Sequence, residues 1–381
     1  WSWSRGLGDV YKRQVKQAAP YLPDTGKTLV LYADVPLITT ASLNKLIKSA
    51  QRKKISILTS KITKPKGYGR IIRDEKMNPT NIREEADAST QEKTINEIFT
   101  GIMIAENEFL KNGLKGLVRN NKAGEYYLTD LVEYASKRKL PIGSTEAKEL
   151  EVFGANNKKE LEGLYSAMVA LNIDAAKKKG TFFKDTSTCY VEGNLKVGKD
   201  VSIGNNVTIK GNVVLGNDVS IGSNVILTNT KIGSNSTIKE FCSIEDSKIS
   251  ENVEVGPFAR LRNGAVLDNS AKIGNFVEVK KSRIGQNAKA NHHAYIGDAD
   301  IGKKSNIGAG TITCNYDGEN KHKTKIGDSV FIGSNSSLVA PLKVGKNSYV
   351  AAGSVVTSDV PAGSLAFGRA KQKNKINWKK K

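Results

Sequence analysis

The chain has 381 residues, a length that favours two domains. Hydrophobic residues make up 38% and charged residues 25%, aromatic residues only 7%, and there are 35 glycines. This composition is typical of many short strands and turns rather than of a helical bundle. Because no apolar run is long enough to cross a bilayer and no signal-peptide pattern is visible, we predict a cytoplasmic protein without a membrane span.

The net charge of +21 admits three classes of partner: nucleic acids, membrane surfaces and small acidic substrates. The lysines are scattered, apart from a dense tail at 371–381, and aromatic residues are not interleaved with arginines as in surfaces that stack bases. We therefore expect no nucleic-acid partner. Small phosphorylated substrates and a general lysine bias both stay open. Cys189, Cys242 and Cys314 lie too far apart to predict a disulfide framework or a metal knuckle.

Residues 1–14, WSWSRGLGDVYKRQ, contain no initiator Met and do not lead into the pattern that follows, so we interpret them as a non-native leader. Residues 27–37 then read as a buried strand ending in a polar turn at Asp34, and a helix is expected at about 41–54. Further strands are expected at ISILTSKI and EIFTGIMIA, and a helix at EYYLTDLVEYASKRK. Because strands and helices alternate, residues 15–156 are predicted to form an α/β domain with a mostly parallel sheet.

Residues 157–180 have a helical pattern suited to a linker, and after about residue 188 a period of six replaces helical periodicity. Apolar residues recur at this step, with one-residue slips, through most of the remaining chain. A hexapeptide period is the signature of a parallel β-helix in which three units close one coil. The 27 positions are Val197, Ile203, Ile209, Leu215, Ile221, Leu227, Ile232, Ile238, Ile244, Ile249, Val255, Leu261, Leu267, Ile273, Val279, Ile284, Ala290, Ile296, Ile301, Ile307, Thr313, Ile326, Ile332, Leu338, Val344, Val350 and Val356.

We therefore predict a left-handed parallel β-helix of about nine coils over residues 181–381. The repeated apolar residue should point inward, and the residue after it, often Gly, should sit at a crowded corner. The polar segment CNYDGENKHKTK at 314–325 interrupts the period and should leave the coil as a loop, where binding groups usually lie.

The three histidines are His292, His293 and His322. A catalytic zinc site needs several histidines that converge from separate coils, and adjacent histidines on a strand point to opposite sides, so we do not expect one. An imidazole beside a carboxylate suits general-base catalysis instead, because it titrates near neutral pH. Glu278 precedes His292 by nearly one coil of the predicted repeat, so the two could be neighbours.

Cations close to this pair would suit a phosphate site, and four of them are available at Arg260, Arg262, Lys280 and Lys281. From spacing alone, the alternative that all these residues are ordinary solvated side chains carries about equal weight.

Four segments, VGPFARLRNGAVL, IGNFVEVKKSRIG, KANHHAYIGDADIG and NIGAGTITCNYDG, closely resemble a known enzyme family. This is the bifunctional N-acetylglucosamine-1-phosphate uridyltransferase and glucosamine-1-phosphate acetyltransferase, and the resemblance covers residues 15–381. It implies acetylation of glucosamine 1-phosphate with acetyl-coenzyme A, a step in making UDP-N-acetylglucosamine for the cell wall. By this resemblance His292 matches the general base and Glu278 the carboxylate that orients it.

The resemblance also implies the residues that bind both substrates, and a homotrimer with acetyltransferase sites between its subunits. Arg262 and Lys280 match cations that hold the sugar phosphate, and Tyr295 and Asn306 match residues that contact the sugar. The acetyl-coenzyme A site is matched by Ala309, Asn315, Tyr316, Ser334, Ala352 and Arg369.

One departure from the family lies beside the matched base, where His293 replaces a residue that is usually apolar. A slip of one residue would turn His293 toward the substrate instead of His292. The family spacing of Tyr295 and Ile296 argues against such a slip.

In the first domain, LYADVPLI resembles the metal-binding strand end of sugar nucleotidyltransferases, with Asp34 matching a Mg²⁺ ligand and Asn156 a second ligand that also touches the substrate. Gly69 and Glu84 match sugar-binding positions. Phe99 stands where the family has a sugar-contacting Asn, so that contact is expected to be lost or replaced.

The resemblance begins just after the family's Gly-rich phosphate loop and uracil-binding segment. We therefore predict uridylyl transfer from UTP for the full-length protein but not for this chain, whose first domain should expose an unpaired strand edge. Two alternatives stay open for the β-helix. It could acylate another acceptor, for which Arg262 and Lys280 would not be needed, or it could be a non-catalytic trimeric scaffold indifferent to His292→Ala.

Overall fold

The structure is a computed structural model that describes residues 15, 17–116, 127–155, 157–376 and 378. These residues fall into two compact units that divide between Ser166 and Ala167, inside helix α5 (Lys158–Lys177). No helix among the described residues is long and apolar enough to cross a membrane.

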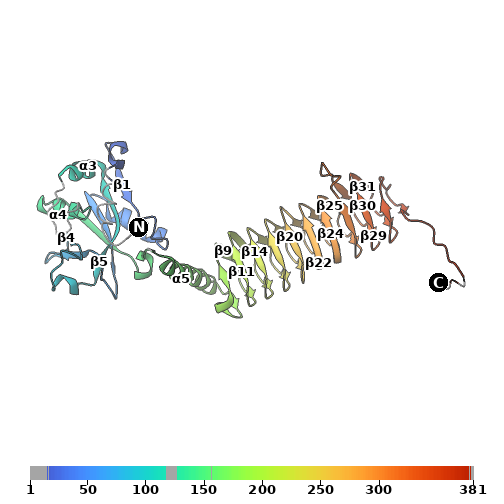
Figure 1. Cartoon of the computed structure of the whole chain (residues 1–381), viewed down its shortest axis with the longest axis horizontal. Coiled ribbons are helices and arrows are strands. Elements are labelled where there is room, and N and C mark those ends of the chain that lie inside the picture. Colours follow the sequence, from blue (N-terminus) through green and yellow to red (C-terminus); the bar gives the residue numbers. More distant parts are fainter. Residues whose placement is uncertain (1–14, 16, 117–126, 156, 377, 379–381) are drawn as a thin grey trace. The chain divides into compact units, whose positions relative to one another are not determined.

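The first unit contains a six-stranded sheet in the order β4-β3-β5-β2-β6, with β1 also paired to the long central strand β5 (Figure 1). Only β2 and β6 pair in parallel, so among the described strands the prediction of a mostly parallel sheet is wrong. The reason is that β5 runs antiparallel to all three of its neighbours. The strands are β1 (Lys27–Val30), β2 (Ile55–Lys61), β3 (Arg70–Arg73), β4 (Pro79–Arg83), β5 (Glu97–Glu106) and β6 (Ile142–Glu146).

The helices of this unit cover both faces of the sheet, because side chains of β5 alternate between two apolar clusters. Phe99 and Met103 pack on the cluster that includes helices α3 and α4, and Ile98 and Ile102 on the one that includes α2. Helix α2 ends earlier than predicted, and the Thr39 hydroxyl caps its start by accepting from the Ser42 amide. The helical segments are η1 (Ala19–Tyr21), α2 (Thr40–Ser49), η2 (Glu92–Thr94), α3 (Asn107–Gly116), α4 (Asp130–Lys137) and η3 (Glu149–Val152).

The second unit is the predicted left-handed parallel β-helix, visible in Figure 1 as a regular stack of strands. Each strand pairs in parallel with its equivalent one coil further on, as in Ser202 with Ser220 and Ser220 with Thr237, and the step is longer only where a segment is inserted. Three hexapeptides therefore make one coil. There are about ten coils rather than nine, because β7 and β8 precede the first repeated position and β34 follows the last.

Two of the three faces of the β-helix form one sheet, because β22 and β24 continue around the corner between them. Its strands are β7 (Phe182–Phe183), β8 (Tyr190–Val191), β10 (Ser202–Ile203), β11 (Thr208–Lys210), β13 (Ser220–Ile221), β14 (Ile226–Thr228), β16 (Thr237–Ile238), β17 (Ser243–Glu245), β19 (Glu254–Val255), β20 (Arg260–Arg262), β22 (Lys272–Lys280), β24 (Lys289–Gly297), β26 (Asn306–Ile307), β27 (Ile312–Cys314), β29 (Phe331–Ile332), β30 (Ser337–Val339), β32 (Tyr349–Val350), β33 (Val355–Val356) and β34 (Leu365–Ala366). A short turn, η4 (Thr186–Thr188), lies between β7 and β8.

The third face is a separate sheet of nine strands. They are β9 (Asn194–Val197), β12 (Asn212–Leu215), β15 (Lys231–Ile232), β18 (Lys248–Ile249), β21 (Val266–Leu267), β23 (Arg283–Ile284), β25 (Ala299–Ile301), β28 (Thr324–Ile326) and β31 (Leu342–Val344).

The repeated positions form the core, as predicted. All are buried except Val197, which is partly buried against the same core. The sequence reasoning missed a second inward position two residues before each, such as Val201, Val207 and Val219, which the two-residue period of a strand places on the same side.

The glycine after the repeated residue sits at a crowded corner, as predicted. A Cβ at Gly204 would lie 2.7 Å from the backbone nitrogen of Ser223 in the next coil.

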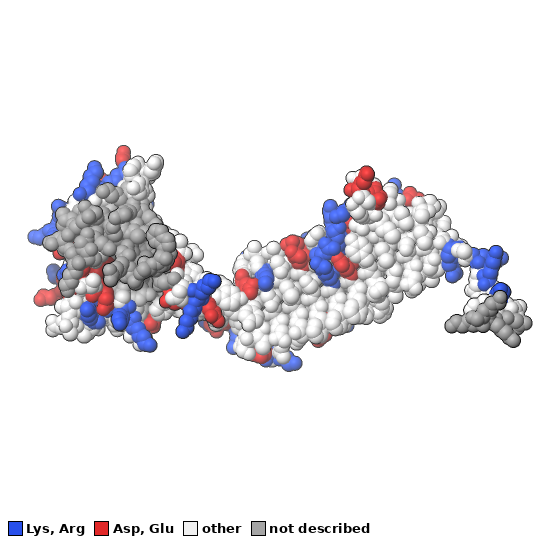
Figure 2. Space-filling model, viewed as in Figure 1, with Lys and Arg blue, Asp and Glu red and all other residues white. Residues whose placement is uncertain are grey.

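The three cysteines are unpaired, as their spacing predicts. Burial raises the pKa of the Cys242 thiol to about 11, so this thiol is protonated and inert at neutral pH. On the side of the β-helix that Figure 2 shows, basic and acidic side chains lie in separate patches with uncharged surface between them.

Candidate active sites

A cavity of about 350 Å³ in the first unit collects most of the residues predicted to bind a sugar nucleotide. Asp34, Gly69, Glu84 and Phe99 all line it, although they come from four separate segments of the chain. Asn156, the other predicted ligand of metal and substrate, lies outside the described residues. The same cavity is lined by Tyr32, Lys66, Gly67, Tyr68, Thr100, Gly101, Tyr127, Leu128, Thr129 and Gly154.

Glu84 projects into this cavity from the end of β4 and accepts a hydrogen bond of 2.9 Å from the Thr129 hydroxyl. Burial raises the pKa of its carboxyl above the usual 4.5, and the bond from Thr129 only partly offsets this. A methyl group at Gly69 would lie 2.8 Å from Ile82 and 3.4 Å from the Glu84 carboxylate, so glycine keeps this wall of the cavity open.

Phe99 is buried in the α3/α4 cluster while it lines the cavity, and its amide donates to the Gly69 carbonyl over 2.8 Å. An aromatic ring cannot make the hydrogen bonds of an Asn amide. The expected loss of that polar contact therefore stays a prediction, with the ring offering an apolar surface in its place.

The loop after β1 carries Asp34 to a position beside the segment that leads to residue 156. The amide of Ala155 donates to the Asp34 backbone carbonyl over 3.1 Å, and a Cβ at Gly154 would lie 3.8 Å from the Asp34 carboxylate. Among the described residues no group of three or more His, Cys, Asp or Glu could hold a metal ion.

In the β-helix, one corner aligns the predicted base with several residues of the predicted acetyl-coenzyme A site. Register pairs Asn275 with His292, and the constant offset between flanking pairs places Ala309, Ser334 and Ala352 in the same column on successive coils. The column therefore presents an imidazole followed by three small side chains along one edge of the solenoid.

His292 is exposed at this corner, and its Nδ1 lies 2.8 Å from the Asn275 Oδ1. His293 is also exposed and has a left-handed backbone with φ 40°. The prediction that the two imidazoles point to opposite sides assumes a flat strand. It does not apply here, because the chain turns a corner at His293. Sequence reasoning missed Asn275, which only the coil-to-coil register could have revealed.

Glu278 lies on the coil adjacent to His292, but the register places it opposite Tyr295, three residues further along. Its carboxylate accepts from the Arg262 Nε over 2.6 Å. Within one chain, Glu278 is therefore the partner of a predicted phosphate-binding cation rather than of the imidazole. Arg262 and Lys280 are themselves opposite one another on β20 and β22.

Asn306 and Arg369 lie apart from this group. Asn306 is on the neighbouring face, where it pairs with Lys289 and Phe331. Arg369 is exposed and follows Gly368, whose carbonyl accepts a hydrogen bond from the Val355 amide.

The interruption of the hexapeptide period is the predicted loop. It leaves β27 after Cys314 and returns at Thr324, with Tyr316 and Lys321 facing each other in an antiparallel bridge. Within it, Asp317 accepts from the amides of Asn320 and Glu319 and from the His322 imidazole, and these bonds lower the pKa of its carboxyl. Tyr316 is exposed and Asn315 is buried at the base.

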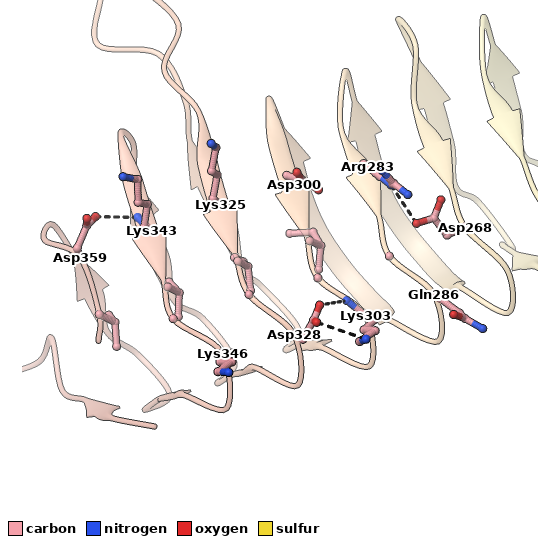
Figure 3. Close-up of a pocket in the computed structure, with 18 of the residues that line it drawn as sticks. Asp268, Arg283, Gln286, Asp300, Lys303, Lys325, Asp328, Lys343, Lys346 and Asp359 are labelled. Carbon is pink, nitrogen blue, oxygen red and sulfur yellow. Dashed lines mark hydrogen bonds and ion pairs between the residues drawn. The ribbon is translucent and has the colours of Figure 1, made fainter. Parts of the chain in front are cut away.

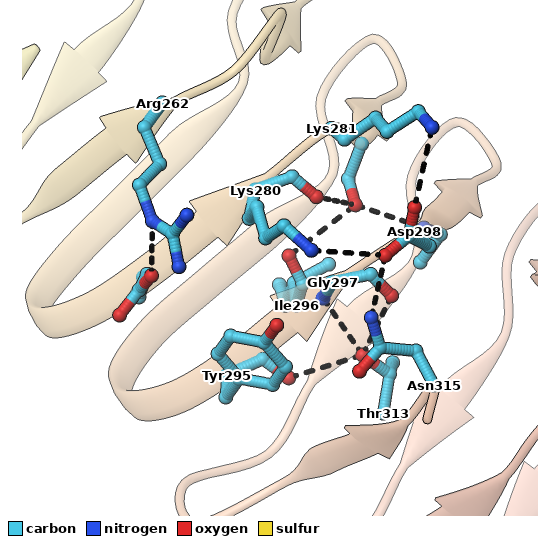
Figure 4. A network of polar contacts seen from close by, with 12 residues as sticks. Arg262, Lys280, Lys281, Tyr295, Ile296, Gly297, Asp298, Thr313 and Asn315 are labelled. Carbon is cyan, nitrogen blue, oxygen red and sulfur yellow. Dashed lines mark hydrogen bonds and ion pairs between the residues drawn. The ribbon is translucent and has the colours of Figure 1, made fainter. Parts of the chain in front are cut away.

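A polar network surrounds Lys280 on the coils below this loop (Figure 4). The Lys280 ammonium lies 3.4 Å from the Asp298 carboxylate, and the Asn315 amide donates to the same oxygen over 2.5 Å. Lys281 approaches the other oxygen at 3.9 Å. The structure thus brings together two residues predicted for different substrates, Lys280 and Asn315, through Asp298, which the sequence reasoning did not select.

Comparison with known proteins gives two matching family models and many close relatives. The GMPPB C-terminal domain model matches residues 186–275, and the bacterial transferase hexapeptide model (six repeats) matches residues 323–358. The chain is 46% identical over 367 residues to the bifunctional protein GlmU of Acinetobacter baylyi, covering 96% of this chain and 81% of that protein. It is 45% identical over 367 residues to the bifunctional protein GlmU of Idiomarina loihiensis, covering 96% and 80%. This chain belongs to the GlmU family.

GlmU proteins join a glucosamine-1-phosphate acetyltransferase to an N-acetylglucosamine-1-phosphate uridyltransferase, so the family predicted from the sequence motifs is confirmed. The structure also overlaps a solved Arabidopsis UDP-N-acetylglucosamine acyltransferase over 47% of this chain and 69% of that one, with 21% identity and a TM-score of 0.42. That similarity is too low to support any conclusion.

A groove of about 800 Å³ lies on the nine-stranded face of the β-helix and is lined by none of the predicted site residues (Figure 3). Its charges largely neutralise one another: Arg283 pairs with Asp268 at 2.9 Å and Lys303 with Asp328 at 3.7 Å. We therefore place the candidate acetyltransferase site at the His292 corner and not in this groove.

Proposed function

We propose that the β-helix transfers the acetyl group of acetyl-coenzyme A to the amine of glucosamine 1-phosphate, with His292 as general base. The observation that carries this proposal is the corner column, in which an exposed imidazole is followed by Ala309, Ser334 and Ala352 on successive coils. Small side chains along an edge leave room for an extended cofactor whose thioester ends at the imidazole.

In this reaction the amine nitrogen attacks the thioester carbonyl while the imidazole takes a proton from the amine. The C–S bond breaks, an amide forms, and coenzyme A leaves as the thiolate or, after taking up the proton, as the thiol. The Asn275 carboxamide oxygen at Nδ1 favours the tautomer that carries its hydrogen there, which leaves the Nε2 lone pair available as the base.

The acceptor's phosphate would lie against Arg262 and Lys280, which occupy paired positions on adjacent strands. The Glu278–Arg262 ion pair supports this placement, because it orients the guanidinium. We assign Glu278 to that role within its own chain. A role beside an imidazole, as the family resemblance implies, would require the imidazole of another subunit.

A homotrimer with sites between subunits is therefore part of the proposal. Three phenylalanines, Phe241, Phe258 and Phe276, stack on successive coils with ring centroids 4.9 and 5.1 Å apart, and His293 continues their column. Although stacked, they are 51%, 44% and 57% exposed. An apolar ridge beside His292 supports the view that a partner subunit covers this corner.

For the first unit we propose Mg²⁺ binding by Asp34 and Asn156, with UTP and N-acetylglucosamine 1-phosphate as the substrates of the family's second activity. The position of the Asp34 carboxylate beside residues 154–155 supports Mg²⁺ binding here, because Mg²⁺ is usually held by one or two protein carboxylates together with substrate phosphates. The ion would neutralise phosphate charge there. Glu84 and the walls formed by Gly69 and Phe99 would position the sugar.

The experiment that tests the main proposal measures release of coenzyme A from acetyl-coenzyme A in the presence and absence of glucosamine 1-phosphate. We expect release that depends on the sugar phosphate and falls by about 10²- to 10⁴-fold in His292→Ala, since that is the usual contribution of a general base. His293→Ala is the matched control and should retain most of the activity. A loss confined to His293→Ala would show instead that the neighbouring imidazole is the base, and no release from folded wild type would refute the acetyltransferase assignment.

A further inference from the structure

A polar network centred on Asp298 joins Lys280 to the base of the loop that interrupts the β-helix (Figure 4). Asp298 lies between β24 and β25 in a left-handed conformation with φ 48°, at the corner where two faces of the β-helix meet. Its side chain is 11% exposed and that of Lys280 is 9% exposed. Charged groups so deeply placed in a folded chain need specific partners, because water no longer solvates them.

Asp298 contacts both stems of the loop formed by residues 315–323. Its carboxylate accepts from the Asn315 side chain, where the chain leaves the coil, and its backbone carbonyl accepts from the Thr324 amide over 3.2 Å, where the chain returns. The loop is longer than an ordinary corner and has no place in the repeating stack. One residue therefore fixes where an irregular segment begins and ends.

The same carboxylate oxygen that accepts from Asn315 is the one nearest the Lys280 ammonium. The Asp298 amide also donates to the Lys280 carbonyl over 3.0 Å, which ties the two coils together at this point (Figure 4). A movement of the loop stem would displace the carboxylate, and a displaced carboxylate would release the ammonium. The loop and the cation consequently share one arrangement.

We propose that Asp298 is a positioning residue of the acetyltransferase site, which holds Lys280 and the base of the 315–323 loop in a single arrangement and so couples the sugar-phosphate side to the acetyl-coenzyme A side. This inference rests on the proposed function for the roles of Lys280 and the loop. We call the contacts of Asp298 with Lys280, Asn315 and Thr324 the clamp. Its effect on the loop can be measured without any substrate.

The test uses the full chain with Asp298→Asn, in which the side chain keeps its shape and suits a left-handed backbone but loses its charge. Hydrogen exchange is measured without substrates, and we expect the 315–324 amides to exchange about tenfold faster while peptides from the coils are unchanged. With both substrates present, kcat/KM should fall at least about tenfold for each, as for the loss of one charge-assisted hydrogen bond. The matched control is Asp300→Asn, an exposed carboxylate two residues further on.

The outcomes separate the proposals. If the 315–324 amides of folded Asp298→Asn exchange hydrogen at the wild-type rate, the clamp is overturned. It is also overturned if kcat/KM falls only as much as the fraction of unfolded protein in the variant explains. Faster loop exchange in a chain whose wild type transfers no acetyl group would support the clamp and refute the proposed function instead. If Asp298→Asn does not fold, Asn315→Ala removes the loop's donor outside the coil and must loosen the same amides.

Discussion

Glu84, a partly buried residue that lines the cavity of the first unit, illustrates how burial of an ionisable group changes the stability of the fold. Its pKa is raised by burial above 4.5, so its charged form is disfavoured in the folded state. Below pH 4.5 the carboxyl is protonated whether the chain is folded or not, and its contribution to stability is fully present. As the pH rises through the raised pKa of the folded state, that contribution is lost, because the unfolded chain ionises more readily.

We therefore predict that Glu84→Gln is more stable than the wild type at pH 7 and that the difference disappears at about pH 4, measured by calorimetric unfolding of the first unit. Glu85→Gln is the control with the opposite sign. Burial alone would raise the pKa of Glu85, but the Gly67 amide and Arg70 outweigh burial and lower it, so its charge stabilises the fold at pH 7. Equal responses of the two variants to pH would contradict this account.

At the scale of the element, the hexapeptide repeat is where sequence reasoning succeeds, because one periodic constraint acts on every coil. An inward apolar residue and a small residue at the next corner were enough to predict the core, the loop and the approximate number of coils. The sheet of the first unit was harder to predict. The central strand β5 is antiparallel to its neighbours, and these pairings join strands that lie far apart in the sequence. The alternation of strands and helices along the chain does not determine the direction of such pairings.

The site residues likewise divide into those that a local sequence motif predicts and those that depend on long-range contacts. Asn275 contacts a residue on another coil and Asp298 contacts a residue of the inserted loop, so these partners depend on coil register and not on local sequence. The motif resemblance pointed to His292. The contact of Asn275 with the His292 ring and that of Asp298 with Lys280 depend on how the coils stack in the structure, and the sequence motifs do not reveal them.

The corner glycines lead to a prediction about the element itself. In Gly204→Ala the new methyl group would meet the Ser223 nitrogen at 2.7 Å and the Gly222 carbonyl carbon at 2.8 Å, and backbone of the next coil cannot rotate away. We expect a loss of about 1–3 kcal/mol in the free energy of unfolding, measured in urea. Gly163→Ala in helix α5 is the matched control, because a Cβ there meets no atom within 4 Å and alanine favours a helix by about 1 kcal/mol. A loss at both positions would point to a general intolerance of alanine rather than to crowding.

At the scale of the whole molecule, the column of Phe241, Phe258 and Phe276 is unusual because all three residues have left-handed backbones, with φ between 53° and 60°. This conformation suits Asn far better than a bulky aromatic residue. Asn224 occupies the same corner one coil earlier, so the backbone here accepts Asn. The aromatic rings are therefore not required by the coil, and their exposure favours a role between molecules.

We accordingly predict that Phe258→Asn combined with Phe276→Asn leaves the β-helix folded, with unchanged circular dichroism, but weakens self-association by at least about tenfold. The reason is that each buried aromatic side chain contributes about 1.5–3 kcal/mol when a partner removes it from water. Sedimentation velocity across a dilution series measures this, and acetyl transfer should decline with the oligomer because the proposed sites lie between subunits. Tyr190→Asn, which removes an aromatic ring 45% exposed on the first coil, is the control. If the double variant associates as the wild type does, the ridge is not the subunit contact, and the partner must cover another face.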